Sequence, residues 1–461
     1  MAGRFVSFRF TMVPTPVQEE ALRRHAGASR FGYNQALALH IAAKRQAREG
    51  VSVSVPYSGF DFINAFNAWK RSLVAGGTPE QPGLPWRAEV FQGVFEEACV
   101  DLGRALEARA DWFKGERKGA CPGKASFKKR ATSRASFRIR NKAGVTGTTG
   151  ATVRFRPLRQ EDAGIPCRAV RLPHKVGGVI RLREDTRRLR RLLAKPETVL
   201  RFVTISRDLD RWTISVTLET GPLHEAHRFS PEEVANAPAV GIDRGLATFA
   251  VLATAEGVEL ERVTHPRPLR AQLPRLRRAS RAHARKVKGS ANRRRAQRRL
   301  QRVHRRIRNV REDFVRRVTS RLAKTHGRLV LETLCTKGLM RTRLARSIAD
   351  SAWARFATRL ARRIQWHGGE VLYAARTYPS TRRCSACGVV GDALPLSQRQ
   401  FHCARCGFEA DRDTNAAINL AKLAETTPLH AAEKPSEAQN ACGGGSAGAG
   451  RSRPSSVELP S

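Results

Sequence analysis

The chain has 461 residues, with 85 lysines and arginines against 40 aspartates and glutamates, which gives a formal net charge of +45. Charge on this scale opposes compaction unless a polyanion neutralises it, so we expect nucleic acid to be the partner. No apolar run reaches about 18 residues and the first residues do not form a signal-peptide core, so we expect a cytoplasmic protein without a membrane anchor.

The first part of the chain reads as one strand followed by helices. Residues 5–10 alternate apolar and polar side chains, as in a half-buried strand. Thr15 then precedes Pro16 and Gln18, which is the pattern of a helix N-cap with a capping box. Helical periodicity follows in three segments, residues 16–48, 59–75 and 87–114.

Beyond these helices the pattern changes to basic loops and short strands. Residues 114–141 form a basic stretch that contains Phe127 and Phe137, which either stack on bases or pack in a small core. Short alternating strands occupy residues 151–220, and the clearest pair forms a hairpin whose turn lies at residues 208–210. One early strand, a helical insert and further strands predict an N-terminal β-barrel that a helical module interrupts.

The second half follows a linker-like segment, residues 229–238, and contains a long arginine-rich helix. Residues 262–311 hold no acidic residue, and apolar side chains recur at helical spacing within residues 293–318. The cationic back of this helix either faces solvent or contacts a nucleic-acid backbone. In the second case we expect the contacts to come from Arg298, Arg302 and Arg305.

Two Cys-x-x-Cys pairs lie near the end of the chain, with 15 residues between them. Their members are Cys384, Cys387, Cys403 and Cys406. Each pair is typical of a knuckle whose thiolates face one tetrahedral ion, and four thiolates close the coordination sphere. We therefore expect structural Zn²⁺ that performs no chemistry. The chain has nine cysteines, an odd number, so a reduced compartment fits better than a disulfide framework.

Three acidic residues each have an ordinary explanation when taken alone. Asp243 would be a turn residue between two glycines, Glu332 a solvated strand end, and Asp413 a helix N-cap. Taken together, two carboxylates that end apolar strands and one that opens a helix, in a strongly basic chain, suggest another role. Converging carboxylates can hold two Mg²⁺ ions about 3.5–4 Å apart on a phosphodiester.

The segment 239–421 resembles the RuvC-type nuclease part of the transposon-encoded TnpB (OrfB) family, relatives of the compact type V CRISPR effectors. The resemblance lies in three motifs, at residues 241–245, 331–338 and 411–417, the last directly after the four-cysteine knuckle. By that pattern the metal-binding acid of the third motif is Asp413 and not Asp411. Residues 15–37 also resemble the opening of the family.

The resemblance implies a multidomain α+β fold. A β-barrel domain would comprise residues 1–13 and 130–227, interrupted by a helical recognition module at residues 14–129. A RuvC-like nuclease domain of the ribonuclease H type would comprise residues 228–376 and 408–424, with a zinc-binding insert at residues 377–407. The tail, residues 425–461, lacks the apolar content to fold and is predicted to be disordered.

The resemblance also implies a function in transposition and DNA recombination. The chain would be an RNA-guided DNA endonuclease, encoded by a transposable element, that takes its guide RNA from the end of that element and cleaves DNA. Asp243, Glu332 and Asp413 would be catalytic and would bind Mg²⁺. The alternatives are a non-cleaving nucleic-acid-binding zinc protein, which the presence of all three acids disfavours, and a compact type V CRISPR effector. A tyrosine-dependent transposase needs a His-x-His pair, and none of the 12 histidines is spaced in that way.

Overall fold

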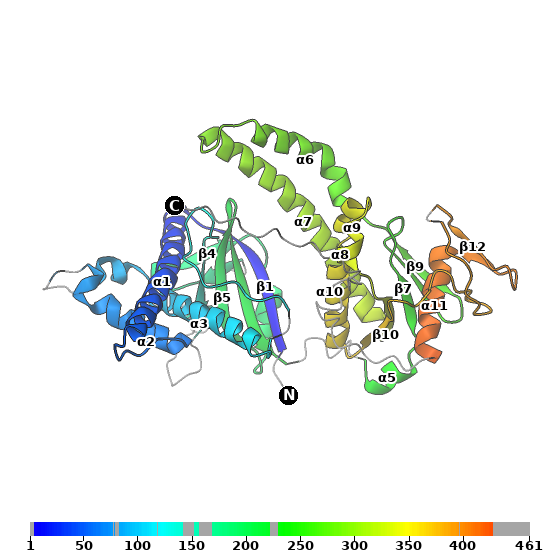
Figure 1. Cartoon of the computed structure of the whole chain (residues 1–461), viewed down its shortest axis with the longest axis horizontal. Helices are drawn as coiled ribbons and strands as arrows, with labels where there is room; N and C mark the ends of the chain where they lie inside the picture. Colours follow the sequence, from blue (N-terminus) through cyan, green and yellow to red (C-terminus); the bar gives the residue numbers. More distant parts are fainter. Residues whose placement is uncertain are drawn as a thin grey trace, which may run out of the picture. The chain divides into compact units, whose positions relative to one another are not determined.

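The computed structural model describes residues 4–76, 78, 83–117, 119–141, 152–155, 168–221, 229–395 and 397–426. The chain divides into two compact units, Met1–Leu223 and His224–Ser461 (Figure 1). The predicted disordered tail lies outside the described residues, except for Glu425 and Thr426, which belong to the last helix. Within these ranges no helix combines the length and the apolar composition that a membrane span requires.

The first unit contains a six-stranded antiparallel sheet with the strand order β2-β5-β6-β1-β4-β3. Its strands are β1 (Arg4–Val13), β2 (Ser136–Arg140), β3 (Ala169–Arg171), β4 (Val179–Leu182), β5 (Val199–Asp208) and β6 (Arg211–Thr220). The sheet is curled, and its end strands β2 and β3 do not pair with each other among the described residues. The predicted barrel is therefore an open half-barrel in this part of the chain. The predicted hairpin is confirmed as β5 and β6, with Leu209 at φ 64° in the turn.

Three main helices of the first unit share a core with this sheet. They are α1 (Pro16–Arg48), α2 (Gly59–Arg71) and α3 (Gly93–Phe113), and the shorter helices are η1 (Leu73–Ala75), η2 (Pro85–Glu89), η4 (His174–Val176) and α4 (Arg187–Leu193). The predicted capping box is present, because Thr15 Oγ1 accepts from the Gln18 N–H at 3.3 Å and Gln18 Oε1 accepts from the Thr15 N–H at 3.0 Å. Because α1, α2 and α3 share one core with the sheet, the helical insert does not pack around a core of its own.

Two details of the first unit differ from the predictions or decide between them. The helix expected from residue 87 begins at Gly93, because Val90 is extended (φ −111°, ψ 139°) and buries its side chain, which separates η2 from α3. Of the two phenylalanines in the basic stretch, Phe137 lies in the core at 2% exposure, whereas Phe127 is 51% exposed. Only Phe127 remains available for stacking on a base.

The second unit contains a mixed five-stranded sheet with the order β11-β10-β7-β8-β9. Its strands are β7 (Val240–Asp243), β8 (Ala250–Thr254), β9 (Glu259–Val263), β10 (Arg328–Glu332) and β11 (Glu370–Ala374). Strands β7, β10 and β11 are parallel, whereas β8 and β9 are antiparallel to their neighbours. Strand β7 is buried along its whole length, as expected for the centre of a covered sheet.

Helices cover both faces of this sheet. One face packs against α7 (Ala291–Thr325) and α10 (Trp353–Trp366), and the other against α11 (Arg412–Thr426). The remaining helices of the unit are α5 (Pro231–Asn236), α6 (Pro268–Ala284), α8 (Thr336–Leu339) and α9 (Ala345–Ser351). The linker predicted at residues 229–238 is therefore partly helical, and Ser230 and Glu233 form a capping box at the start of α5.

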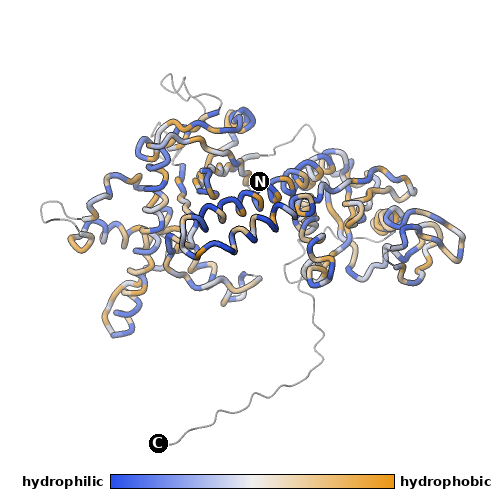
Figure 2. The backbone as a smooth tube through the Cα atoms, turned by 90° about the horizontal axis from the view of Figure 1, so that it is seen from above, coloured by the Kyte–Doolittle hydropathy of each residue, from blue (hydrophilic) through white to orange (hydrophobic). Residues whose placement is uncertain are grey.

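Helices α6 and α7 lie side by side as a long hairpin (Figure 1), and hydrophilic residues dominate both (Figure 2). The arginine-rich helix expected at residues 293–318 is α7, which extends beyond the predicted range at both ends, from Ala291 to Thr325. Its apolar stripe is buried only in part, because Val310 is 40% exposed. A carboxylate from α9 holds the base of the hairpin: Asp350 accepts from the Leu269 N–H at 2.9 Å and from Arg311 Nη2 at 3.1 Å. Asp350 thereby caps α6, whose own N-cap residue makes no side-chain cap.

Candidate functional site

The three acids predicted as a site come from elements that meet at one edge of the mixed sheet. Asp243 is the last residue of β7 and Glu332 the last residue of β10. These strands are parallel neighbours with Leu331 opposite Ile242, so both side chains lie at the carboxyl edge of the sheet. Asp413 lies in the first turn of α11, which packs on β7 and β8. The structure therefore brings acids from three distant segments to one place.

The close approach of α11 to β7 depends on residues without bulk. A Cβ atom at Gly241 would collide with the carbonyl oxygen of Ala417, and it would stand 2.7 Å from the amide nitrogen of Ala421. Ala417 is itself fully buried. A Cβ atom at Gly245 would lie 3.6 Å from Asp413 Oδ2, which puts this carboxylate beside the turn that follows Asp243. Glycine at position 241 thus lets the helix approach the strand and deliver its acid to the strand end.

Asp411 and Asp413 have different surroundings. Asp411 Oδ1 accepts hydrogen bonds from the N–H groups of Asp413 at 3.0 Å and Thr414 at 3.2 Å, so Asp411 caps α11. Asp413 is 7% exposed, and its carboxylate lies 3.8 Å from Arg399 Nη1 and 3.7 Å from Arg412 Nε. The capping role that was the alternative explanation for Asp413 therefore belongs to Asp411.

The two strand-end acids, Asp243 and Glu332, have raised pKa values. Burial raises the pKa of Asp243 well above its ordinary value, and the neighbouring charges of Glu332 and Asp413 raise it further against the opposing effect of Arg244. Burial also raises the pKa of Glu332, with Asp413 adding to the shift and Arg244 opposing it. A bound divalent cation would relieve this mutual repulsion, so the donor set fits an oxygen-liganded metal.

Sequence reasoning missed Arg244, which lies between the two strand-end acids. It is 7% exposed, its Nη2 donates to the main-chain oxygen of Glu332, and its Nε lies 3.8 Å from Glu332 Oε1. The guanidinium thereby joins the ends of β7 and β10. The signal available in the sequence was its place directly after Asp243, between that acid and Gly245.

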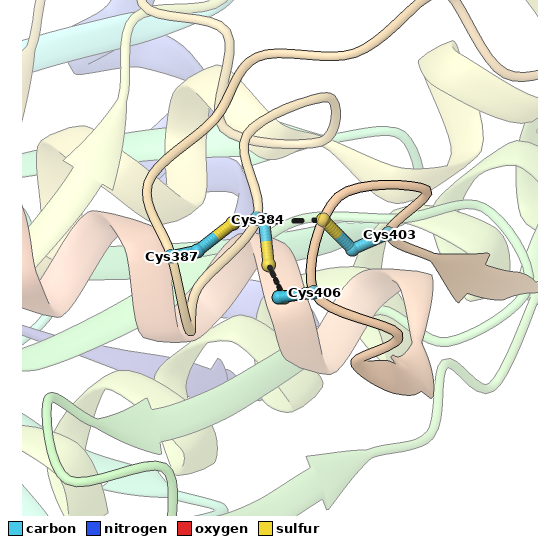
Figure 3. Close-up of side chains that lie close together, drawn as sticks. All are labelled: Cys384, Cys387, Cys403 and Cys406. Carbon is cyan, nitrogen blue, oxygen red and sulfur yellow. Dashed lines mark hydrogen bonds between the residues drawn. The ribbon is translucent and has the colours of Figure 1, made fainter.

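The four predicted cysteines converge as a zinc site requires (Figure 3). The Sγ atoms of Cys384 and Cys406 lie 3.7 Å apart, and those of Cys387 and Cys403 lie 3.6 Å apart. A Zn–S distance of about 2.3 Å gives a tetrahedral edge of about 3.8 Å, so the cluster fits Zn²⁺ with little adjustment. All four ligand atoms lie within 4.8 Å of one another, and no other group of three such side chains in the described ranges is gathered as tightly. The three acids are thus neighbours but not a closed cluster.

Each cysteine pair is shaped by the glycine that follows it. Gly388 donates its N–H to the Cys384 oxygen and Gly407 to the Cys403 oxygen, both at 2.9 Å. Both glycines have positive φ, 76° and 69°, which lets the backbone turn back below the sulfurs. The second pair lies between β12 (Gln400–His402) and β13 (Glu409–Asp411), which pair antiparallel, and β13 leads directly into α11.

A cationic groove of about 680 Å³ runs between α6 and α7. Alanines of both helices line it together with six basic residues: Arg275, Arg278, Lys286, Arg295, Arg299 and Arg302. Of the three predicted contact residues, Arg302 lines this groove, whereas Arg298 and Arg305 lie on α7 outside it. Sequence reasoning missed the second wall, which α6 supplies, although this helix is part of the same acid-free stretch.

Three family models match the chain. Residues 5–48 match a helix-turn-helix domain of the OrfB type found in IS605 elements, residues 214–343 match the OrfB model described as a probable transposase, and residues 353–420 match the TNB domain of Cas12f1-like proteins. The structure forms residues 5–48 differently from the first description, as strand β1 and a single helix, α1. The third match contains the four cysteines and all three residues Asp411, Asp413 and Asn415.

Curated proteins resemble the chain over most of its length. It is 33% identical over 430 residues to a protein of Mycobacterium tuberculosis (strain H37Rv) named "Putative RNA-guided DNA endonuclease", covering 91% of this chain and 86% of the relative. It is 28% identical over 433 residues to InsQ of Escherichia coli (strain K12), which has the same designation, covering 90% and 92%. A Streptomyces pristinaespiralis relative with that designation is 38% identical over 229 residues, covering 49% and 52%.

Solved structures resemble the chain more remotely. A Cas12f1–sgRNA–target DNA complex is 12% identical with a TM-score of 0.32, covering 91% of this chain and 99% of that chain. The RNA-guided endonuclease CRISPR-Cas_phi3 is 10% identical with a TM-score of 0.39, covering 92% of each chain. At these scores the likeness carries no argument about the site.

Proposed function

Since the chain belongs to the TnpB (OrfB) family of IS605-type elements, we propose that it is an RNA-guided DNA endonuclease whose nuclease site comprises Asp243, Glu332 and Asp413. The observation that carries the assignment is the convergence of these acids at the carboxyl edge of one sheet, where Glu332 and Asp413 raise the pKa of Asp243. Family membership supports the proposed reaction, and the geometry supports the choice of these three residues.

The domain organisation follows the same assignment. We propose a wedge-like β domain at residues 1–13 and 130–227 around a helical recognition module at residues 14–129. A RuvC-like nuclease domain of the ribonuclease H type comprises residues 228–376 and 408–424, with a zinc-ribbon insert at residues 377–407. Two acids on central strands and one on a late helix, directly after the four cysteines, support this division.

Asp243, Glu332 and Asp413 would hold Mg²⁺, and Mg²⁺ in such a site activates a water for attack and stabilises the leaving oxygen of a phosphodiester. The protein's own contribution is to fix the carboxylates. Arg244 binds the main chain of Glu332, and Asp411 caps the helix that carries Asp413. Arg399, whose side chain is half exposed and lies 3.8 Å from Asp413, is placed to meet a phosphate that approaches this acid.

The nucleic acids would be a guide RNA from the end of the element and the DNA that pairs with it. The net charge of +45 and the cationic groove between α6 and α7 support binding through phosphates. Sequence would then be read mainly by guide pairing. We include Arg298, Arg302 and Arg305 among the residues that contact the backbone.

The test is cleavage of a DNA duplex by the purified protein loaded with RNA from the element end. We expect Mg²⁺-dependent cutting that requires a match between the RNA and the DNA. Tight guide-dependent binding without cutting would favour the non-cleaving alternative. A repeat array beside the gene, in place of transposon ends, would instead favour a compact type V CRISPR effector.

A further inference from the structure

One face of α11 binds the chain that leads into the first cysteine pair. Asn415, Asn419 and Lys422 follow one another at helical spacing, and each side chain bonds to the main chain of residues 380–385. Lys422 Nζ donates to the Ser385 oxygen at 2.6 Å, and Asn419 Nδ2 donates to the oxygens of Ser380 at 2.9 Å and Arg383 at 2.6 Å. The helix is thus attached to this segment over about two turns.

Asn415 binds the backbone on both sides of one cysteine. Its Oδ1 accepts from the Ser385 N–H at 2.9 Å, and its Nδ2 donates to the Arg383 oxygen at 2.8 Å. Cys384 lies between these two residues. Asn415 is fully buried and Ser385 is 5% exposed, so water cannot replace either bond at low cost. A buried polar group left unpaired is destabilising, so both hydrogen bonds of this clamp favour one position of the helix relative to Cys384.

Asn415 is also close to the candidate nuclease site along the chain. It follows Asp413 by two residues in the first turn of α11. The clamp therefore connects a cysteine of the zinc centre to the helical turn that carries the third acid. Its path runs from Cys384 through the adjoining peptide groups and the Asn415 amide to the backbone of Asp413.

We propose that Asn415 is a positioning residue that makes the placement of Asp413, and hence divalent-metal binding at the nuclease site, depend on the zinc centre. This inference rests on the proposed function. The four cysteines then do more than stabilise a local loop, because the coordinated first pair fixes the Arg383 and Ser385 peptides, and these fix the start of α11. Residues that orient a metal ligand from outside its coordination sphere typically change metal affinity by about 10–100-fold.

The test compares Mn²⁺ binding by the full-length wild-type protein, Asn415→Ala and Asp413→Asn, measured from the electron paramagnetic resonance signal of free Mn²⁺. Zinc content and thermal melting are measured on the same samples. We expect Asn415→Ala to keep one zinc per chain and to bind Mn²⁺ at least about 10-fold more weakly. Its cleavage should fall at low Mg²⁺ and recover at high Mg²⁺, whereas partial unfolding would lower activity equally at all Mg²⁺ concentrations.

A matched control is Asn34→Ala in the other unit. Asn34 makes the same two-bond clamp, to the Lys128 oxygen at 3.0 Å and the Lys128 N–H at 2.8 Å, and its loss should leave Mn²⁺ binding unchanged. A second arm removes zinc from the wild-type protein with a chelator that is then washed away. Zinc removal should weaken Mn²⁺ binding by about the same factor as Asn415→Ala. If Asn415→Ala does not fold, this measurement tests whether metal binding depends on the zinc centre.

Two results would overturn the inference. Unchanged Mn²⁺ binding in folded, zinc-loaded Asn415→Ala would show that the clamp does not position the acid. Unchanged Mn²⁺ binding after zinc removal from the wild type would show that metal binding at the nuclease site does not depend on the zinc centre. If Asp413→Asn also binds Mn²⁺ like the wild type, the proposed site itself is wrong; if only Asp413→Asn loses binding, the site stands and the positioning role falls.

Discussion

Replacing Asp413 with asparagine tests metal binding apart from helix capping, because the proposed metal-binding role belongs to Asp413 whereas Asp411 caps the helix. Asp411 accepts from two backbone N–H groups at the start of α11. Asp413 has arginine neighbours at 3.7 and 3.8 Å, and its charge raises the pKa of Asp243. Removing that charge therefore lessens repulsion in the metal-free protein while it weakens a metal site.

The expected effects differ in size and in sign. Asp413→Asn should reduce cleavage by more than about 100-fold, since even residues outside the coordination sphere change metal affinity by about 10–100-fold. The melting temperature of the metal-free protein should not fall. Asp411→Asn should keep most activity, because asparagine caps helices about as well as aspartate. Asp411→Ala should cost about 0.5–2 kcal/mol of stability through the lost cap.

The assay is single-turnover cleavage of a guide-matched duplex across a Mg²⁺ series, with guide-dependent DNA binding and melting recorded on the same preparations. An Asp413→Asn protein that cuts at a near wild-type rate would refute the metal role. An inactive Asp411→Asn protein beside it would mean that the other aspartate binds the metal. Asp243→Asn combined with Glu332→Gln should be little worse than either change alone, since acids that hold the same ions act as one unit.

Three further predictions address the zinc centre, the arginine-rich helix and pH. Cys384→Ser should release zinc and lower the melting temperature, because three thiolates leave the ion incompletely coordinated; a variant that keeps one zinc per chain by elemental analysis would contradict this. Changing Arg298, Arg302 and Arg305, three of the many arginines of α7, to alanine should weaken binding to all sequences alike and flatten its salt dependence; an unchanged salt slope would exclude backbone contact by these residues. Because the folded state raises the pKa of Asp243 above 3.8, it binds more protons than the unfolded state, so without metal the stability should fall as pH rises through the interval between 3.8 and the raised pKa. Asp243→Asn should lessen that fall in a melting series over pH, and a steeper fall would count against the burial of this carboxyl.

The sequence predicts those parts of the site that depend on local pattern. Asp243 and Glu332 each follow a short apolar run that favours a buried strand, and the spacing of the cysteines predicts a metal knuckle. The same is true of the capping box at Thr15, where three residues determine where α1 begins.

What the sequence does not predict depends on contacts between distant segments. The family resemblance selects Asp413 over Asp411, but local physical pattern does not distinguish them, because their different surroundings follow from how β13 enters α11. Asn415 reads as an ordinary helical residue until the chain around Cys384, some thirty positions earlier, lies against it. The open half-barrel and the second wall of the cationic groove likewise arise from pairings between segments that have no signature of their own.

The contact of Gly241 with α11 has a consequence for how this protein can change over generations. Any other residue there would place a carbon atom against main-chain atoms of Ala417 and Ala421, which no choice of rotamer can avoid. A single mutation at this codon must therefore displace the whole helix and the acid that it carries, so there is no sequence of small, individually tolerated steps away from glycine. Lineages that inherit an active enzyme should inherit this glycine too, whereas those in which cutting is no longer selected are free to lose it.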